Sequence, residues 1–216
     1  MSGSVHERWL DYAVDVVAST DHDCTKDGGG CLEGGGESWM RWPGYLGSEF
    51  REGVGLLLVG NVHRDFTSNN VPLWVSELLV STTKHLRADP ENHRSQYFSE
   101  VQAAYHRGLA GDDDGGEPWK VARPFAYILR QLGMSWPEVA YTNASKSQHD
   151  SAPSKLITGC LSRWPLEELA TRLDARAVIT CSAPARESLA NKGLAVHYFP
   201  QRYSYAKLDE IATAIL

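Results

Sequence analysis

The sequence has no long apolar stretch. Its longest purely aliphatic run, at residues 56–59, is Leu-Leu-Leu-Val, whereas a helix that spans a bilayer needs roughly 20 apolar residues. No basic segment followed by an apolar one opens the chain, so no secretory signal is indicated. We therefore expect a soluble, non-exported protein of the cytoplasm with no membrane partner.

Cysteine is also scarce. The four cysteines, Cys24, Cys31, Cys160 and Cys181, are too few and too scattered for the disulfide framework of a secreted protein, so we expect reduced thiols. His22 lies near Cys24 and Cys31, and these three side chains could bind zinc, but their glycine-rich segment offers no obvious fourth ligand. We expect no metal site.

Basic residues are not in excess. The net charge is −6, from 27 acidic and 21 basic side chains, and residues 1–38 hold eight of the acidic ones against two basic ones. The rest of the chain is therefore neutral as a group, and it would need a local basic patch to bind nucleic acid. We expect two parts: an acidic N-terminal helix with a glycine-rich loop at residues 1–38, and a single α/β domain at residues 39–216.

Apolar residues recur with two different periods along the chain. Helical spacing occurs at residues 5–17, over most of 74–131, and at 165–173, 185–190 and 208–215. Short apolar runs that indicate buried strands lie at 54–59, 138–142, 177–180 and 195–199. Alternating strands and helices predict a parallel sheet between helical layers. Ligands of such sheets bind beyond the carboxyl ends of the strands.

The loop after the first of these strands carries a dense set of polar groups. Asn61, His63, Arg64 and Asp65 stand within five residues, and together they could position a water, stabilise an anion and hold a phosphate. The alternative is a solvated turn in which Asp65 caps a helix. Neither a Gly-x-Gly-x-x-Gly fingerprint nor a phosphate-binding P-loop is present.

The loop after the second strand begins with Asn143. An asparagine side chain offers both a donor and an acceptor, so a single residue can read the edge of a pyrimidine base. The alternative is an asparagine that only forms a turn.

The order of these segments resembles that of the uracil-DNA glycosylase superfamily. The resemblance runs from about Trp42 to the C-terminus. It depends on the Gly-Val-Gly-Leu-Leu-Leu-Val-Gly segment at 53–60, the segment 132–143 that ends in Asn143, the segment 161–188, and Phe-Pro-Gln-Arg at 199–202. It implies a three-layer αβα sandwich with a central parallel sheet of about four strands, and DNA as the partner.

The chain departs from this family at the positions that carry catalysis. Asn61 stands where one branch has its Glu, and Val62 stands where other branches have Asp or Asn. His63 and Arg64 replace a Pro and its successor, and Phe199 replaces the family's His, with His197 two residues upstream. The resemblance therefore implies a substrate other than plain uracil, such as a bulky modified pyrimidine of the kind that phage genomes carry.

Two branches of this family hold an iron-sulfur cluster on four cysteines. Cys160 falls near one ligand position, but Ser147 occupies another, and Cys24 and Cys31 are spaced too widely for the family's tight pair. A cluster needs four thiolates, so we expect neither a cluster nor any other cofactor.

The sequence thus predicts a monomeric, monofunctional DNA glycosylase that acts in base excision or in defence against phage. The residues expected to take part are Asn61, His63 and Asp65 in catalysis; Asn143, Phe66, Trp74 and His197 in binding the base; and Arg64, Lys146, Gln201, Arg202 and Tyr203 in binding DNA. Phe66 or Trp74 would stack on the flipped base, although such rings are equally typical of a core. The alternative is an inactive relative that only binds nucleic acid or a nucleotide, which Val62 and Phe199 favour.

Overall fold

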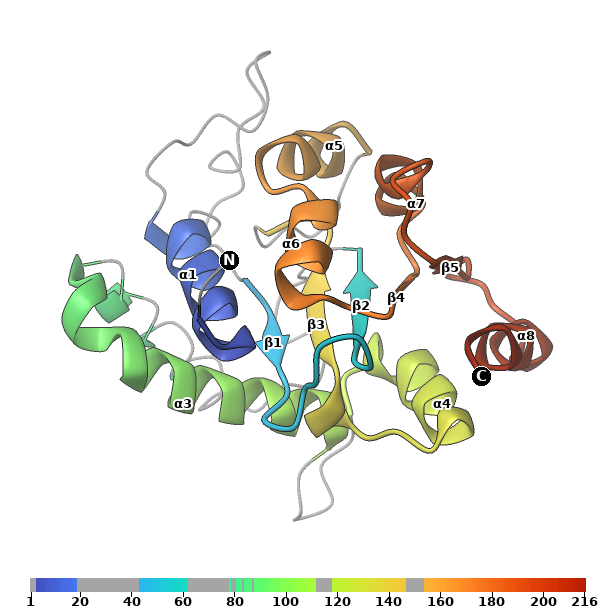
Figure 1. The fold of residues 1–216 in the computed structure, drawn as a ribbon, viewed down its shortest axis with the longest axis horizontal. Helices are drawn as coiled ribbons and strands as arrows, with labels where there is room; N and C mark the ends of the chain where they lie inside the picture. Colours follow the sequence, from blue (N-terminus) through green and yellow to red (C-terminus); the bar gives the residue numbers. More distant parts are fainter. Residues whose placement is uncertain are drawn as a thin grey trace.

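The computed structural model describes residues 3–18, 43–61, 78, 81–82, 84–86, 88–111, 118–146 and 154–216. The helices of these parts are α1 (Val5–Ala18), α3 (Pro90–Ala110), α4 (Ala122–Leu132), the short 3-10 helix η2 (Trp136–Glu138), α5 (Ser154–Arg163), α6 (Leu166–Leu173), α7 (Ala183–Leu189) and α8 (Tyr205–Ile215). The strands are β1 (Tyr45–Leu46), β2 (Leu56–Gly60), β3 (Ala140–Asn143), β4 (Ala177–Thr180) and β5 (Val196–Tyr198). Figure 1 shows their arrangement.

The sheet is mixed and has five described strands in the order β1-β3-β2-β4-β5. The four predicted strands are present and parallel, as expected. The expectation of a purely parallel sheet is wrong at one edge, because β1 pairs with β3 in the antiparallel direction (Figure 1). This strand has only two residues, which is too short to show a period in the sequence.

The central strand, β2, is apolar because both of its faces are covered. Leu56, Leu57, Leu58 and Val59 are fully buried, as is typical of a strand inside a parallel sheet with helices on both sides. Its predicted start at Val54 is two residues early, since Val54 lies in a turn and is 45% exposed.

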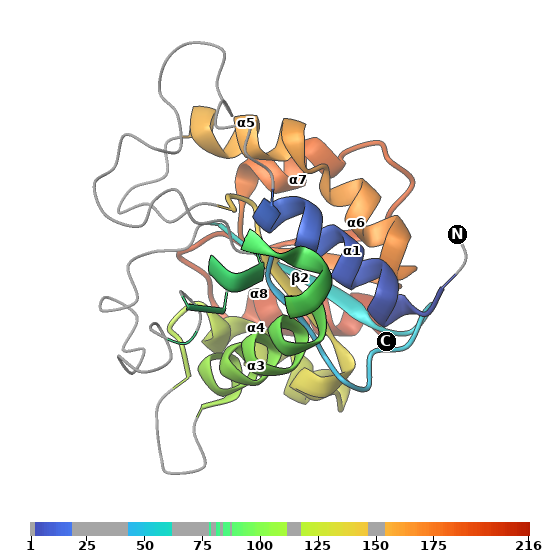
Figure 2. The ribbon, with the colours of Figure 1, turned by 90° about the vertical axis from the view of Figure 1, so that its left-hand side faces the viewer.

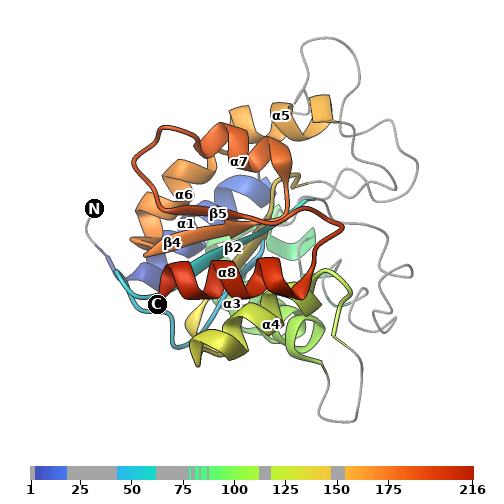
Figure 3. The same ribbon diagram turned by 90° about the vertical axis from the view of Figure 1, so that its right-hand side faces the viewer.

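Helices cover both faces of the sheet. Figure 3 shows α1, α5, α6 and α7 on one side and α3, α4 and α8 on the other, and α4 packs on α8 as α1 packs on α6. The chain is therefore an α/β protein with three layers. None of the described helices combines the length and the apolar character needed to cross a membrane.

The N-terminal helix α1 belongs to the same core as the rest of the described chain. Trp9, Tyr12, Ala13, Val16 and Val17 form the stripe that the sequence predicts, and all five are buried. Figure 2 shows α1 next to α3 at the β1 edge of the sheet. The helix α1 thus covers this end of the sandwich.

Candidate functional site

The carboxyl ends of the parallel strands meet at one edge of the sheet, which we call the carboxyl edge. Backbone hydrogen bonds join them beyond the last paired residues: Ala144 N donates to Gly60 O at 2.9 Å, and Ser145 N donates to Asn61 O at 3.0 Å. Phe199 N donates to Thr180 O at 3.1 Å. The loops that follow β3 and β2 therefore start side by side, and the loop after β5 starts beside the end of β4, on the far side of β4 from β2.

Asn143 is the last residue of β3, and its side chain is held in place. The Tyr141 hydroxyl donates to Asn143 Oδ1 at 2.9 Å, and Asn143 is only 2% exposed. Burial raises the pKa of Tyr141 well above its usual value, so the hydroxyl keeps the proton that it donates. Among the described residues no group accepts a hydrogen bond from Asn143 Nδ2. The amide therefore has a fixed polarity, with Oδ1 turned toward the Tyr141 hydroxyl.

Gly60, at the end of β2, makes this arrangement possible. A Cβ atom at this position would lie 2.2 Å from Asn143 Oδ1 and 2.5 Å from the Tyr141 hydroxyl. Both distances are too short for any real contact, so only glycine leaves room for the amide and the phenol. Gly60 and Asn143 are paired across the two strands.

Tyr141 and Asn143 lie on the face of the sheet that α4 and α8 cover, because alternate residues of a strand share a face. The Tyr141 ring contacts Phe125 of α4, with centroids 6.1 Å apart, and Phe125 contacts Phe199 at 5.3 Å. Phe199 is 1% exposed. An aromatic layer thus lies behind the Asn143 amide.

Lys146 has a different position from the one expected of a DNA contact. Its side chain is fully buried, and Nζ donates to Thr142 Oγ1 at 2.5 Å and to Asn143 O at 2.6 Å. The ring of Tyr12 on α1 lies 5.8 Å away, and burial lowers the pKa of Lys146 to about 7. In this structure Lys146 supports the backbone of Asn143 and does not present its amine to a phosphate. A lysine in a polar loop gives no sign of such burial.

Of the other described residues of the predicted site, all but His197 lie in segments that leave the carboxyl edge. Asn61 follows β2 and is half-buried, while Gln201 and Arg202 are exposed in the loop after β5. Tyr203 is half-buried, with its ring 5.8 Å from Phe199. His197 lies within β5, and burial lowers its pKa, which favours a neutral imidazole.

Several predicted residues lie outside the described part of the chain. They are His63, Arg64, Asp65, Phe66 and Trp74, together with the Cys24 and Cys31 pair. Cys160 and Cys181 are buried, and burial raises the pKa of the Cys181 thiol to about 12. Within the described ranges no three metal-ligating side chains come together.

A pocket of about 800 Å³ lies away from the carboxyl edge, between α3, β1 and η2. Its lining includes Tyr45, Gln102 and Pro137. Pro137 precedes β3, and Glu49 N donates to its carbonyl at 2.8 Å. The pocket therefore lies at the opposite end of β3 from Asn143, and it is not the place where Asn143 could contact a base.

Two supporting residues were missed by sequence reasoning. Tyr141 and Gly60 both shape the Asn143 amide, and the strand alternation that puts Tyr141 on the same face as Asn143 could have identified the first of them. No protein-family model matches the chain, and no curated protein matches it. Inference about function therefore depends on the chemistry of the carboxyl edge.

Proposed function

We propose that this protein is a DNA glycosylase that takes a damaged or modified pyrimidine out of the duplex and hydrolyses its N-glycosidic bond. The observation that carries the proposal is the Asn143 amide, which Tyr141 holds with one polarity at the carboxyl edge of the sheet. Ligands of open α/β sheets bind at this edge. A flipped base is read there by hydrogen bonds to its edge.

The polarity of the amide suits a pyrimidine. Asn143 Oδ1 is occupied by the Tyr141 hydroxyl, so the amide would act through its two Nδ2 protons. Pyrimidines offer a ring carbonyl as acceptor, and such a contact rejects bases that place a donor at the same point. The resemblance to the uracil-DNA glycosylase superfamily points to the same role for this residue.

Bond cleavage needs little from the protein beyond a positioned water and stabilisation of the departing base. The transition state resembles an oxocarbenium ion, and charge that develops on the base is stabilised by donors that are already in place. Asn61 follows β2 at the carboxyl edge, and in the proposal its side chain orients the water with Asp65, while His63 donates to the base. Arg64, with Gln201 and Arg202 of the exposed loop after β5, would contact phosphates.

The test is base release from duplexes that carry uracil, hypoxanthine, hydroxymethylcytosine or glucosylated hydroxymethylcytosine, followed by hot alkali to break abasic sites. We expect strand breaks with at least one modified pyrimidine. Asn143→Asp keeps an acceptor for Tyr141 but loses the donor, and it should lower base release at least about 100-fold, as should Asn143→Ala. Asn92→Ala, at an exposed site near the start of α3, is the matched control. Full activity of both Asn143 variants would contradict the proposed role of the amide.

A second candidate, a binding protein without catalysis, is favoured by Phe199. This residue takes the place of the family's catalytic His, and it is buried between the rings of Phe125 and Tyr203. Its side chain has no group that could donate a proton or a hydrogen bond. Binding to one of the duplexes without any strand breaks across the whole panel would support this candidate instead of the enzyme.

A further inference from the structure

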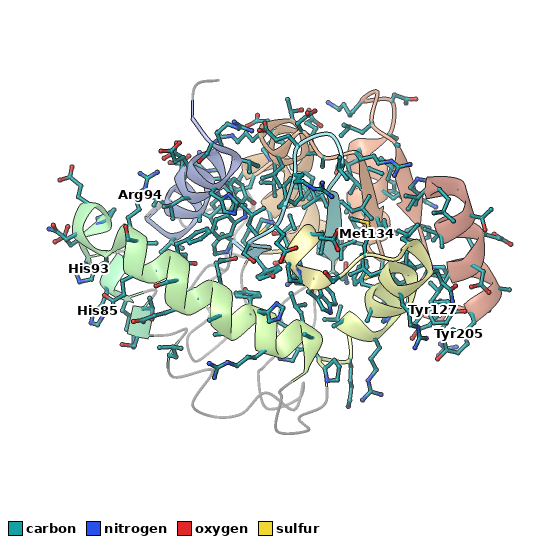
Figure 4. The ribbon with its side chains drawn as sticks, turned by 60° about the horizontal axis from the view of Figure 1, so that its bottom comes forward. His85, His93, Arg94, Tyr127, Met134 and Tyr205 are labelled. Carbon is teal, nitrogen blue, oxygen red and sulfur yellow. The ribbon has the colours of Figure 1, made fainter. Side chains whose placement is uncertain are left out.

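The aromatic layer behind Asn143 continues outward beyond Phe199. Tyr203 contacts Phe199 at 5.8 Å, Tyr205 contacts Tyr203 at 6.3 Å, and Tyr127 contacts Tyr205 at 4.8 Å between ring centroids. Figure 4 shows Tyr127, in the middle of α4, beside Tyr205, at the start of α8. The rings thus form a continuous row from the carboxyl edge to the surface.

Exposure rises along the row as far as Tyr205, and Tyr127 beyond it is half-buried. Phe199 is 1% exposed, Tyr203 is half-buried, and Tyr205 is 63% exposed. In the described part of the chain, Tyr205 is the only aromatic side chain among the exposed large hydrophobic residues. A ring that is fixed by its neighbours and open to solvent loses little conformational entropy when a flat ligand stacks on it.

Positive charges surround these tyrosines. The Arg130 guanidinium lies 5.5 Å from the centre of the Tyr127 ring, and Arg202 is exposed next to Tyr203 in the chain. Burial raises the pKa of Tyr203, and the nearby charge of Arg123 partly opposes this rise. Asp209, the acid nearest to the row, accepts a hydrogen bond from the Tyr127 hydroxyl at 2.8 Å. Aromatic rings interspersed with arginines are typical of surfaces that bind single-stranded nucleic acid.

We propose that Tyr205 and Tyr127, with the arginines beside them, form a stacking surface for unpaired bases of a DNA strand. Any base can stack on such a ring, so this surface needs no particular sequence, and the arginines contact the phosphates that connect the bases. The choice of DNA as the ligand rests on the proposed function, because the row begins at the edge where Asn143 would read a base. The surface extends that edge onto α4 and α8.

The test measures the affinity of the full chain for fluorescent oligo-dT, with variants at Tyr205 and a matched control. Tyr205→Ala should weaken binding about tenfold, whereas Tyr205→Trp, which keeps an aromatic ring, should bind as well as the parent or better. Val54→Ala removes another exposed apolar side chain, 45% exposed at the amino end of β2, and should change nothing. High salt should weaken oligo-dT binding by the parent and all variants to the same extent, because salt screens the charges of the arginines but does not affect stacking.

Equal affinity of parent and Tyr205→Ala for oligo-dT would overturn the inference, as would a parent that does not bind it at low salt. A change in self-association on Tyr205→Ala, measured by sedimentation and with oligo-dT affinity intact, would make the row a contact between copies of the chain and would also overturn it. Failure of the proposed function looks different. In that case no duplex of the panel is cleaved, while oligo-dT binding still depends on Tyr205.

Discussion

On one face of β3, Thr142 lies beneath a buried lysine and the N-terminal helix, whereas on the other face Tyr141 and Asn143 lie against rings that reach the surface. The first face is closed: Lys146, Thr142 and Tyr12 are all buried. The second face opens gradually, from Phe199 to the exposed Tyr205. We call these the lysine face and the aromatic face.

The difference shows that the two faces at the end of β3 hold different parts of Asn143. On the lysine face, Lys146 Nζ and Thr142 Oγ1 form a chain of hydrogen bonds that ends on Asn143 O and on Pro43 O. On the aromatic face, the Tyr141 hydroxyl fixes the side chain of the same Asn143. Because neighbouring residues of a strand point to opposite faces, Asn143 is held by its backbone from one side and by its side chain from the other.

The largest expected effect comes from filling the space on the aromatic face. In Gly60→Ala the new Cβ would displace both Asn143 Oδ1 and the Tyr141 hydroxyl. We expect base release to fall at least about 100-fold, and the free energy of unfolding to fall by about 1–3 kcal/mol, measured by urea denaturation and by the duplex assay at a temperature where the variant is folded.

Gly47→Ala is the matched control for this substitution. Its Cβ would lie 2.1 Å from the backbone carbonyl oxygen of Pro137, at the opposite end of β3, so it should destabilise the protein without a selective loss of base release. If Gly60→Ala released bases at the parental rate while folded, the position of the Asn143 amide would not matter, and the two faces would not differ in function.

Helices and strands could be predicted wherever apolar residues recur with a regular period in the sequence. The limits of β4 are those predicted, and α4 ends at Leu132 because Gly133 adopts a φ of +66° there. The strand β1 could not be predicted, since its two residues, Tyr45 and Leu46, are specified by pairing with β3 and not by a local pattern.

The place of the candidate site in the sheet could be predicted from the sequence, but the residues that hold Asn143 in position could not. Asn143 was singled out because it stands where a predicted strand ends, and it is the last residue of β3. Lys146 lies near the ring of Tyr12, 134 positions earlier in the chain, and its amine interacts electrostatically with Cys160 of α5. The row that ends at Tyr205 likewise joins α4 and α8 through tertiary contacts. Contacts between distant segments leave no pattern in the local sequence.

A smaller effect is expected on the lysine face, in the pH dependence of stability. In the unfolded chain a lysine keeps its proton to about pH 10, whereas in the folded protein burial lowers the pKa of Lys146 to about 7. Between these values unfolding takes up a proton, so stability should rise with pH. From pH 7 to 8.5 the gain should be about 1–2 kcal/mol, and it should be absent in Lys146→Met, both measured by urea denaturation.

Two other buried groups act on stability at higher pH. Burial raises the pKa of Cys181 to about 12 and that of Tyr12 well above its usual value, so both oppose the gain, but only above about pH 8.5 and 10, where their unfolded forms ionise. The Cys160 thiol faces Lys146 from α5, and Cys160→Ala should preserve the gain. An identical pH dependence of the free energy of unfolding in the parent and in Lys146→Met would mean that Lys146 is not the group that titrates. Burial of this lysine would then carry no electrostatic cost.

The smallest effects come from a matched pair of hydroxyl deletions, one on each face. Tyr141→Phe removes the donor to Asn143 Oδ1 and should lower the free energy of unfolding by about 1 kcal/mol, with a loss of base release because the amide is free to turn. Tyr12→Phe removes a buried hydroxyl that makes no hydrogen bond of normal geometry with the described residues. It should leave stability unchanged or raise it by up to about 1 kcal/mol, with base release intact.

The pair separates the two faces because both rings are buried, at 1% and 5% exposure for Tyr141 and Tyr12, and both substitutions remove a single oxygen. Urea denaturation and the duplex assay on the same preparations give the two comparisons. Equal losses of stability would show that the Tyr12 hydroxyl also has a partner in solution, with Thr142 the nearest candidate, and the lysine face would then hold Asn143 as firmly as the aromatic face. A loss of base release in Tyr12→Phe alone would reverse the assignment, because the backbone support of Asn143 would then control its chemistry more than the side-chain hydrogen bond does.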